Sequence, residues 1–230
     1  MRNIHAKFQV CRLYCSGDFV MSTSVFTVAA HDQSLLENNV KYTIISEHED
    51  IFYIHPITGE ITVKRTEFLD YEIRKEVHFS VLAENSMASA VCGVTVFLQD
   101  INDNAPQFEQ SYIRASVWEA QAYDAYITQI YATDSDSGRN GEIEYSILFG
   151  NINEVFLIDS SRGIISTNMA LDREDISLYR LVVQAADKGT PGLFAICTVE
   201  IEVVDINDNA PTLQPFDVIH LSEKLSLKFA

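Results

Sequence analysis

A seven-residue segment, DINDNAP, occurs twice in this chain, beginning at Asp100 and again at Asp205. Each copy presents two carboxylates and two side-chain amides, four groups that can offer oxygen ligands, before a proline ends whatever structure precedes it. Two further pairs of acids stand in LDYE, residues 69–72, and in LDRE, residues 171–174. In an extended segment both acids of such a pair point to one side, where they repel each other unless a cation lies between them. The residue types therefore indicate sites for an oxygen-ligated cation.

The spacing of the two DINDNAP segments predicts the elements that position these groups. Because 205 − 100 = 105, the period is 105 residues, which indicates two copies of one domain rather than a solenoid of short units. Segments such as VHFSVLAEN, YRLVVQAAD and CTVEIEVVD are short, rich in β-branched or aromatic residues, and bounded by turn formers. They predict an all-β fold of two tandem immunoglobulin-like Greek-key β-sandwiches, each seven-stranded and antiparallel. Only EAQAYDAY, residues 119–126, has a helix-like pattern.

The two copies also share a hairpin pattern. FYIHPITGEI, from Phe52, aligns without gaps with FLIDSSRGII, from Phe156. The shared apolar positions predict core residues, and the shared glycines, Gly59 and Gly163, predict a tight turn that requires a positive φ angle.

The composition restricts the partners. Lys and Arg number 16 against 33 Asp and Glu, a net charge of −17, which disfavours nucleic acid and anionic lipid as partners and favours cations. No apolar run reaches the roughly 18 residues needed to span a bilayer. Cys92 and Cys197 stand at equivalent places and follow the apolar parity of their strands, so we expect buried free thiols and no zinc or redox site.

Five motifs follow one another in a fixed order: FxIxxxxGxI, LDYE or LDRE, ATDSDSGRNGEIEYSI, AADKGTPGL and DINDNAP. In this order they resemble extracellular cadherin repeats of the protocadherin kind and of giant Fat- or Dachsous-like cadherins. The resemblance covers nearly the whole chain. It implies a repeat at residues 1–104 with a degenerate N-terminal part, a second repeat at residues 105–209, and the start of a truncated third repeat at residues 210–230.

The resemblance further implies a calcium cluster at each junction between repeats. Calcium takes six to eight oxygens from carboxylates, amides and backbone carbonyls, and DINDN supplies all three kinds. Carried over to this sequence, the ligands expected at the central junction are Asp70, Glu72, Asp100, Ile101, Asn102, Asp103, Asn104, Asp134, Asp136, Asn140 and Asp187. Half of a second cluster is expected from Glu119, Asp172, Glu174, Asp205 and Asp208.

Charge supports a cation at the central junction. Seven of the expected ligands there are carboxylates, and without metal so many acids in one small volume repel by several kcal/mol even at an effective dielectric constant near about 20. The first repeat departs from the pattern, because counting back about 103 residues from the first-strand acid Glu119 of the second repeat leads to Ser16 in the first. We therefore expect the outermost ion of the central junction to bind most weakly.

Simpler interpretations exist for single motifs. DSDSGRN, residues 134–140, is also typical of an acidic turn, and DINDNAP alone of a linker stopped by proline. An EF-hand is excluded, because Arg139 stands where that loop needs glycine and Tyr145 where it needs a bidentate acid.

Three hypotheses for function remain after the motifs are considered together. The first is a calcium-dependent cell-adhesion module that binds other cadherin ectodomains, homophilically or heterophilically, on the extracellular side of the plasma membrane. The second is a calcium-stiffened spacer without its own adhesive face. The third, an enzyme with paired carboxylates as in glycosidases, is disfavoured because the acids stand in metal-ligand order, so we expect no catalysis and no small-molecule substrate. Trp118, the single tryptophan, is expected to pack at the end of its repeat, the alternative being an exposed centre of binding energy. We expect the chain to be a soluble fragment of a longer, membrane-anchored protein.

Overall fold

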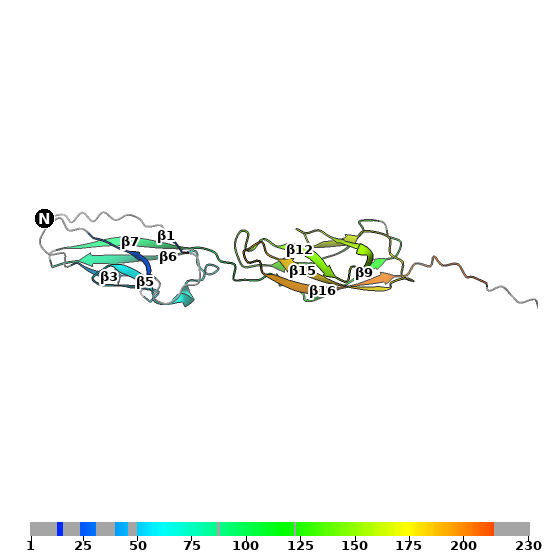
Figure 1. The fold of residues 1–230 in the computed structure, drawn as a ribbon, viewed down its shortest axis with the longest axis horizontal. Coiled ribbons are helices and arrows are strands. Elements are labelled where there is room, and N and C mark those ends of the chain that lie inside the picture. Colours follow the sequence, from blue (N-terminus) through cyan, green and yellow to red (C-terminus); the bar gives the residue numbers. More distant parts are fainter. Residues whose placement is uncertain are drawn as a thin grey trace, which may run out of the picture.

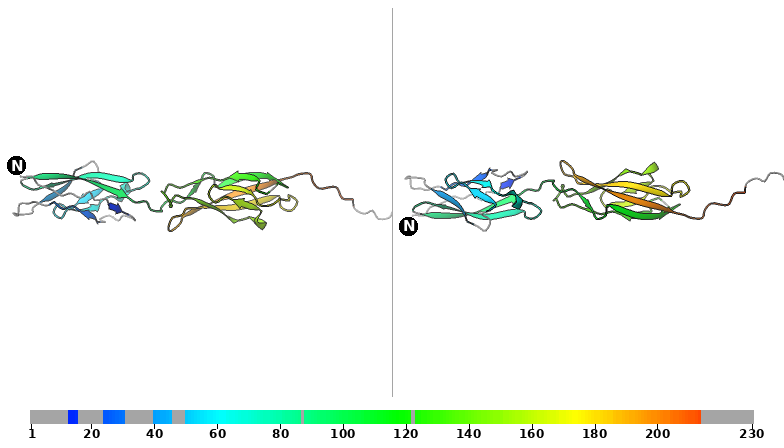
Figure 2. Two further views of the ribbon diagram at one scale, coloured as in Figure 1. Left: turned by 90° about the horizontal axis from the view of Figure 1, so that it is seen from above. Right: turned by 90° about the horizontal axis from the view of Figure 1, so that it is seen from below.

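Two β-sandwiches lie end to end along the long axis of the molecule and are joined by an extended linker (Figures 1 and 2). This computed structural model describes residues 13–15, 24–30, 40–45, 50–86, 88–121 and 123–213. Ser16, residues 31–39 and the expected third repeat beyond residue 213 lie outside the described residues. Within the described part of the chain, no helix is long and apolar enough to cross a membrane.

The described residues of the first repeat form two facing sheets. One has the strand order β1-β7-β6-β3 and the other the order β2-β5-β4. The strands are β1 (Leu13–Cys15), β2 (Ser24–Thr27), β3 (Lys41–Ile45), β4 (Phe52–Ile54), β5 (Glu60–Val63), β6 (Glu76–Glu84) and β7 (Ser89–Leu98), with a 3-10 helix η1 (Thr66–Phe68) before β6.

The second repeat has the same arrangement with two of its strands interrupted. Its sheets are β12-β15-β16-β9 and β10-β14-β13, with a short β11-β8 pair at the junction end. The strands are β8 (Gln107–Phe108), β9 (Tyr112–Trp118), β10 (Tyr126–Gln129), β11 (Ala132–Thr133), β12 (Glu144–Phe149), β13 (Phe156–Ile158), β14 (Ile164–Thr167), β15 (Leu178–Ala186) and β16 (Phe194–Val204), with a 3-10 helix η2 (Ile152–Glu154) before β13.

Alternating burial along the strands builds a separate core in each repeat. In β15 every second residue, from Tyr179 to Ala185, is buried, and in β16 the buried residues run from Cys197 to Val203. Ile61 and Ile165, which the hairpin alignment equates, are both completely buried, and each such side chain contributes about 1.5–3 kcal/mol by leaving water. The aligned pair Phe52 and Phe156 is buried as well, and so is Ile54, whereas its counterpart Ile158 is only partly buried. The predicted core positions are therefore confirmed except at Ile158.

The predicted hairpin glycines are also confirmed. Gly59 has a φ angle of 71° and Gly163 one of 67°, values that favour glycine over every other residue. A Cβ atom at Gly163 would lie 2.5 Å from the carbonyl oxygen of Ile130, so the backbone after β10 can come this close only because residue 163 is a glycine.

Several local expectations were wrong. The sandwiches are not purely antiparallel, because β1 pairs with β7 and β9 with β16 in parallel. The chain enters each repeat at one pole and leaves at the other, so its first and last strands run the same way and are parallel where they meet. In the helix-like segment 119–126, Glu119, Ala120, Tyr123 and Asp124 lie in turns and Tyr126 begins β10, so its described residues form no helix. Cys197 is buried as expected, but Cys92 is only half-buried.

Candidate metal centre at the repeat junction

The linker after β7 and three loops bring the expected acids to one place. LDYE is not extended, as the sequence suggested, but forms a turn after η1, in which Asp70 accepts hydrogen bonds at its backbone oxygen from Arg74 N and at Oδ1 from Ile73 N. This turn faces the DINDN linker. On the opposite side of the linker, the DSDSGRN loop follows β11 and Asp187 follows β15.

Asn102 connects the linker to the second repeat. Its amide nitrogen lies 3.1 Å from both carboxylate oxygens of Asp187 and 2.6 Å from the carbonyl oxygen of Pro191. Asp187 is itself buried and accepts from the backbone N–H groups of Gly189 and Leu193. A Cβ atom at Gly189 would lie 2.3 Å from the Asn102 amide nitrogen, so glycine is required for this approach.

Asn104 makes a second connection. Its backbone nitrogen donates to Asp136 Oδ2 at 3.2 Å, and its amide donates to Asp136 Oδ1 at 2.7 Å. Asp100 accepts at Oδ2 from Ser137 N at 3.1 Å and from the amide of Asn140 at 3.0 Å. All of these contacts run from the linker to the DSDSGRN loop, and they join carboxylates to neutral donors.

Three oxygens at this junction lack a partner among the residues that the structure describes. Asp100 Oδ1, Asn102 Oδ1 and Asp134 Oδ2 are buried and make no hydrogen bond to any of those residues. In addition, Glu72, Asp100 and Asp136 each offer a carboxylate oxygen, and these oxygens lie within 4.8 Å of one another. Burying an unpartnered carboxylate oxygen is costly, and a group that accepts electron pairs from several oxygens at once would offset that cost.

The pKa values of the acids at the junction show that their charges repel one another. Partial desolvation, the largest cause, raises the pKa of Glu72 to about 7 although the residue as a whole is exposed, and the charges of Asp103 and Asp100 add to this effect. Desolvation, followed by the charge of Asp136, raises the pKa of Asp103. The same two causes raise the pKa of Asp134, with Asp187 and Asp100 contributing further repulsion. The acids are thus electrostatically coupled across the junction.

The donor set fits calcium. Carboxylate and amide oxygens are the ligands that this hard cation prefers, and a dication would relieve both the unpartnered oxygens and the mutual repulsion. The seven expected carboxylates are linked to one another by these contacts and electrostatic interactions, so the structure brings the expected central set together. Coordination of a metal by any of these residues, including Ile101 and the expected carbonyl groups of Asn104 and Asn140, stays a prediction.

The expected half-cluster at the far end of the second repeat differs in its electrostatics. Glu119, Glu174 and Asp205 offer oxygens within 4.8 Å of one another. Glu119 is buried, and the backbone N–H groups of Ile206 and Arg173 lower its pKa. Arg173 Nη1 lies 3.5 Å from Asp205 Oδ1. Protein donors thus already neutralise part of this cluster.

The remaining half-cluster residues lie at its edge. Asp172 opens a turn and accepts from Glu174 N, and Asp208 is exposed and contacts the amide of Asn209. The roles of Gly189 and Arg173 were missed from the sequence. The charge of Arg173 between two acids was visible there, whereas the close approach at Gly189 depends on the tertiary fold.

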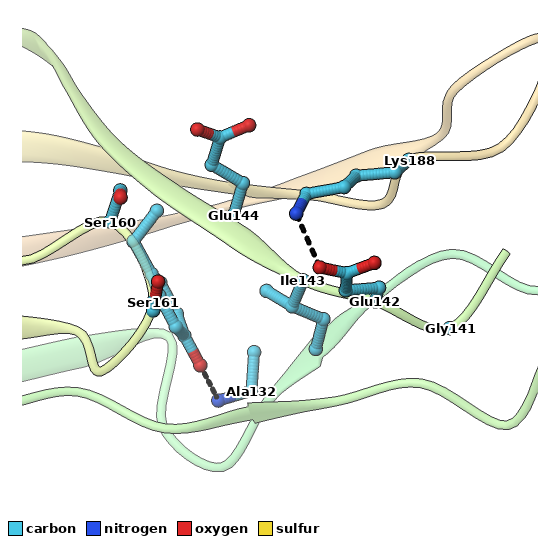
Figure 3. A pocket seen from close by; sticks show the side chains of 9 residues that line it. Ala132, Gly141, Glu142, Ile143, Glu144, Ser160, Ser161 and Lys188 are labelled. Carbon is cyan, nitrogen blue, oxygen red and sulfur yellow. Dashed lines mark hydrogen bonds and ion pairs between the residues drawn. The ribbon is translucent and has the colours of Figure 1, made fainter. Parts of the chain in front are cut away.

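A separate hollow on the side of the second repeat contains no comparable set of groups. Within it, Lys188 pairs with Glu142, and the hydroxyl of Tyr145 accepts from the backbone nitrogen of Ala132 at 2.9 Å (Figure 3). Its principal polar groups therefore satisfy one another.

Comparison with known proteins gives one consistent family. The chain is 48% identical over 202 residues to human Protocadherin-23 and 38% identical over 201 residues to human Protocadherin Fat 1. These alignments cover 87% and 85% of this chain but only 6% and 4% of those proteins.

Solved structures agree with the sequence relatives. The structure of mouse clustered PcdhgC3 EC1-3 is 29% identical, with a TM-score of 0.77, over 87% of this chain and 67% of that chain. The structure of mouse Cadherin-23 EC22-24 is 26% identical, with a TM-score of 0.74, over 86% and 63% of the two chains. Residues 18–99 and 113–204 each match the cadherin domain, and the chain therefore belongs to the cadherin family.

Proposed function

We propose that this chain is a calcium-dependent cell-adhesion module of a protocadherin-like ectodomain, in which calcium makes the junction between the two repeats rigid. Cadherin repeats generally bind calcium. The observation that carries the proposal for this chain is the set of three buried, unpartnered oxygens, on Asp100, Asn102 and Asp134, inside a cluster of carboxylates from both repeats.

The proposed calcium ligands come from both repeats and from the linker between them. Asp70 and Glu72 belong to the first repeat, Asp134, Asp136 and Asp187 to the second, and DINDN lies between them. When bound, calcium supplies positive charge and multiple coordination to these oxygens. Asn102 and Asn104 hold the linker on the second repeat, so that a cation held by both sides couples two otherwise separate bodies.

Small-angle scattering with calcium and then with chelator tests the clamp. With calcium we expect a narrow distribution of inter-repeat distances, and after chelation a broader one, because the seven acids then repel. Circular dichroism must show that both sandwiches stay folded. An unchanged distance distribution with intact sandwiches would rule the clamp out.

The alternative, a calcium-stiffened spacer, shares this clamp and lacks only an adhesive face. Affinity of the chain for another cadherin ectodomain separates the two. We propose such ectodomains, rather than nucleic acid or a small-molecule substrate, as partners, and we assign the acids to ligation rather than catalysis. We also propose an extracellular position at the plasma membrane, where the relatives named as protocadherins place such repeats.

The division of the chain at residues 1–104, 105–209 and 210–230 remains a proposal. It is supported by the two separate cores and by the two matched segments, which end and begin on either side of the linker.

A further inference from the structure

The outer face of the sheet β12-β15-β16-β9 carries an unusual number of exposed apolar side chains. The registers place Thr198 beside Tyr112, Val182 beside Thr198, and Phe149 beside Val182, so these residues form one row across the sheet. Ile196 and Phe194 continue on the same side of β16 toward the junction. The exposed fractions are Tyr112 42%, Phe149 70%, Phe194 60% and Ile196 56%. Leu148, which stands next to Phe149 at the register irregularity of β12, is 40% exposed.

The first repeat shows that the fold does not require this surface. Offset by 105 residues, Ser89 stands for Phe194, Val91 for Ile196 and Gly93 for Thr198. Across from Gly93, β6 presents Ser80. The first repeat therefore has smaller side chains at several of these places, although Val91 and Ile45 on the same outer face are 57% and 40% exposed. The bulk of Phe149, Phe194 and Ile196 is thus more than the sheet itself requires.

The size of the patch is in the range of a binding surface. Aromatic side chains present about 150–250 Å² each, so the five exposed residues together leave on the order of 500 Å² uncovered. This lies toward the upper end of the largest patch on a typical monomer, about 300–600 Å². It is more than half of the roughly 800 Å² that each partner contributes to a standard interface.

The charges on this face differ from those of the whole chain. In the row below the patch, Glu200 lies between two guanidinium groups, 2.9 Å from Arg180 and 3.5 Å from Arg114. With Glu202 on β16 and Glu144 on the edge strand, the face carries two cations against three carboxylates, whereas the chain carries −17. Long-range repulsion opposes the approach of two such acidic molecules, and a nearly neutral face adds little to that repulsion where it meets its partner.

Trp118 lies on the same side of β9 as Tyr112 and Arg114, at the end away from the junction. It is 53% exposed, contrary to the expectation that it packs at the end of its repeat. Tryptophan and arginine are frequent centres of binding energy in interfaces. The patch therefore continues past the ion-pair row.

We propose that this face of the second repeat binds the same face of a second copy of the chain. A second copy carries the same negative charge, so its approach depends strongly on a surface that is locally neutral. When a face pairs with the same face of another copy, the result is a closed dimer with two-fold symmetry. The proposal rests on the proposed adhesive function and names its surface and partner.

Sedimentation velocity over a concentration series, in calcium, tests the proposal. We expect a monomer–dimer equilibrium in the wild-type chain. Ile196→Glu and Phe149→Glu should each weaken it at least tenfold, because a charge would be buried against an apolar partner. Val91→Glu is the matched control: Val91 is 57% exposed at the equivalent place in the first repeat, and its replacement should leave the dimer unchanged.

Two outcomes would overturn the proposal: a wild-type chain that stays monomeric at several hundred micromolar, or a dimer that Ile196→Glu and Val91→Glu affect equally. Because these side chains are exposed, the variants should keep the wild-type circular dichroism and melting temperature. Scattering on the monomeric Ile196→Glu variant, with calcium and with chelator, tests the clamp independently. An experiment that contradicts the proposed dimer surface can therefore be distinguished from one that contradicts the proposed calcium-dependent junction.

Discussion

At the scale of single residues, the acids of the central cluster are on the whole more buried and face more acids of a neighbouring repeat than those of the half-cluster. Asp136 is buried and holds the linker through Asn104, whereas Asp208 is exposed and lacks facing acids from another repeat within the described chain. Asp136→Ala should therefore weaken calcium binding at the central junction by tenfold or more, since loss of even an outer-shell partner costs about 10–100-fold. Asp208→Ala should leave that binding nearly unchanged.

Isothermal calorimetry on both variants measures this difference. Asp136→Asn is a useful control, because it retains a side-chain oxygen for the N–H of Asn104 while removing one charge. Equal losses of affinity in Asp136→Ala and Asp208→Ala would mean that the complete and incomplete clusters are wrongly assigned.

Glu72 predicts the pH dependence of the calcium-free chain. Its folded pKa, about 7, lies above the ordinary value of 4.5, so between these values the folded chain holds a proton that the unfolded chain lacks. Stability contributed by this proton is gained as the pH falls through about 7 and is complete near 4.5. We expect the melting temperature with chelator to be higher at pH 6 than at pH 8.

The matched variant is Glu72→Gln, which removes the titrating group and should flatten this part of the pH profile. A profile that Glu72→Gln leaves unchanged would show that other groups determine the dependence.

At the scale of elements, the hairpin glycines give the sharpest test of the fold. Gly163→Ala places a methyl group against the Ile130 carbonyl oxygen at a positive φ angle, and we expect it to lower the free energy of unfolding by more than about 1 kcal/mol. Gly93→Ala is the control, since a Cβ atom there meets nothing within 4 Å. Urea unfolding measures both, and equal effects would contradict the close approach.

The elements also show what periodicity can predict. The alternation in β15 and β16 and the shared hairpin identify the core residues, because burial on one face of a strand leaves a period of two in the sequence. The same alternation occurs in parallel and in antiparallel strands, so the parallel pairing of β9 with β16 was not predictable from it. The turn at Asp70 was missed for a related reason: its hydrogen bonds come from Ile73 and Arg74, residues without turn character.

At the scale of the whole molecule, the repeat length and motif order predicted which acids meet. They did not predict which donors those acids accept from. Asn102 is separated in the chain by 85 residues from Asp187, which it contacts, and by more from Gly189, which leaves space for that contact. Whether a carboxylate oxygen ends with a partner or without one depends on such long-range contacts, and the three unpartnered oxygens are visible only in the folded structure.

The parallel pairing of first and last strands has a mechanical consequence. Tension along the molecule pulls β9 from one pole and β16 from the other, and the register joins them from Tyr112–Thr198 to Trp118–Val204. Such a load acts along the strands, so the hydrogen bonds between them bear shear together instead of opening one after another. A repeat built this way resists stretching by its topology, and its rupture force should depend on this strand pair.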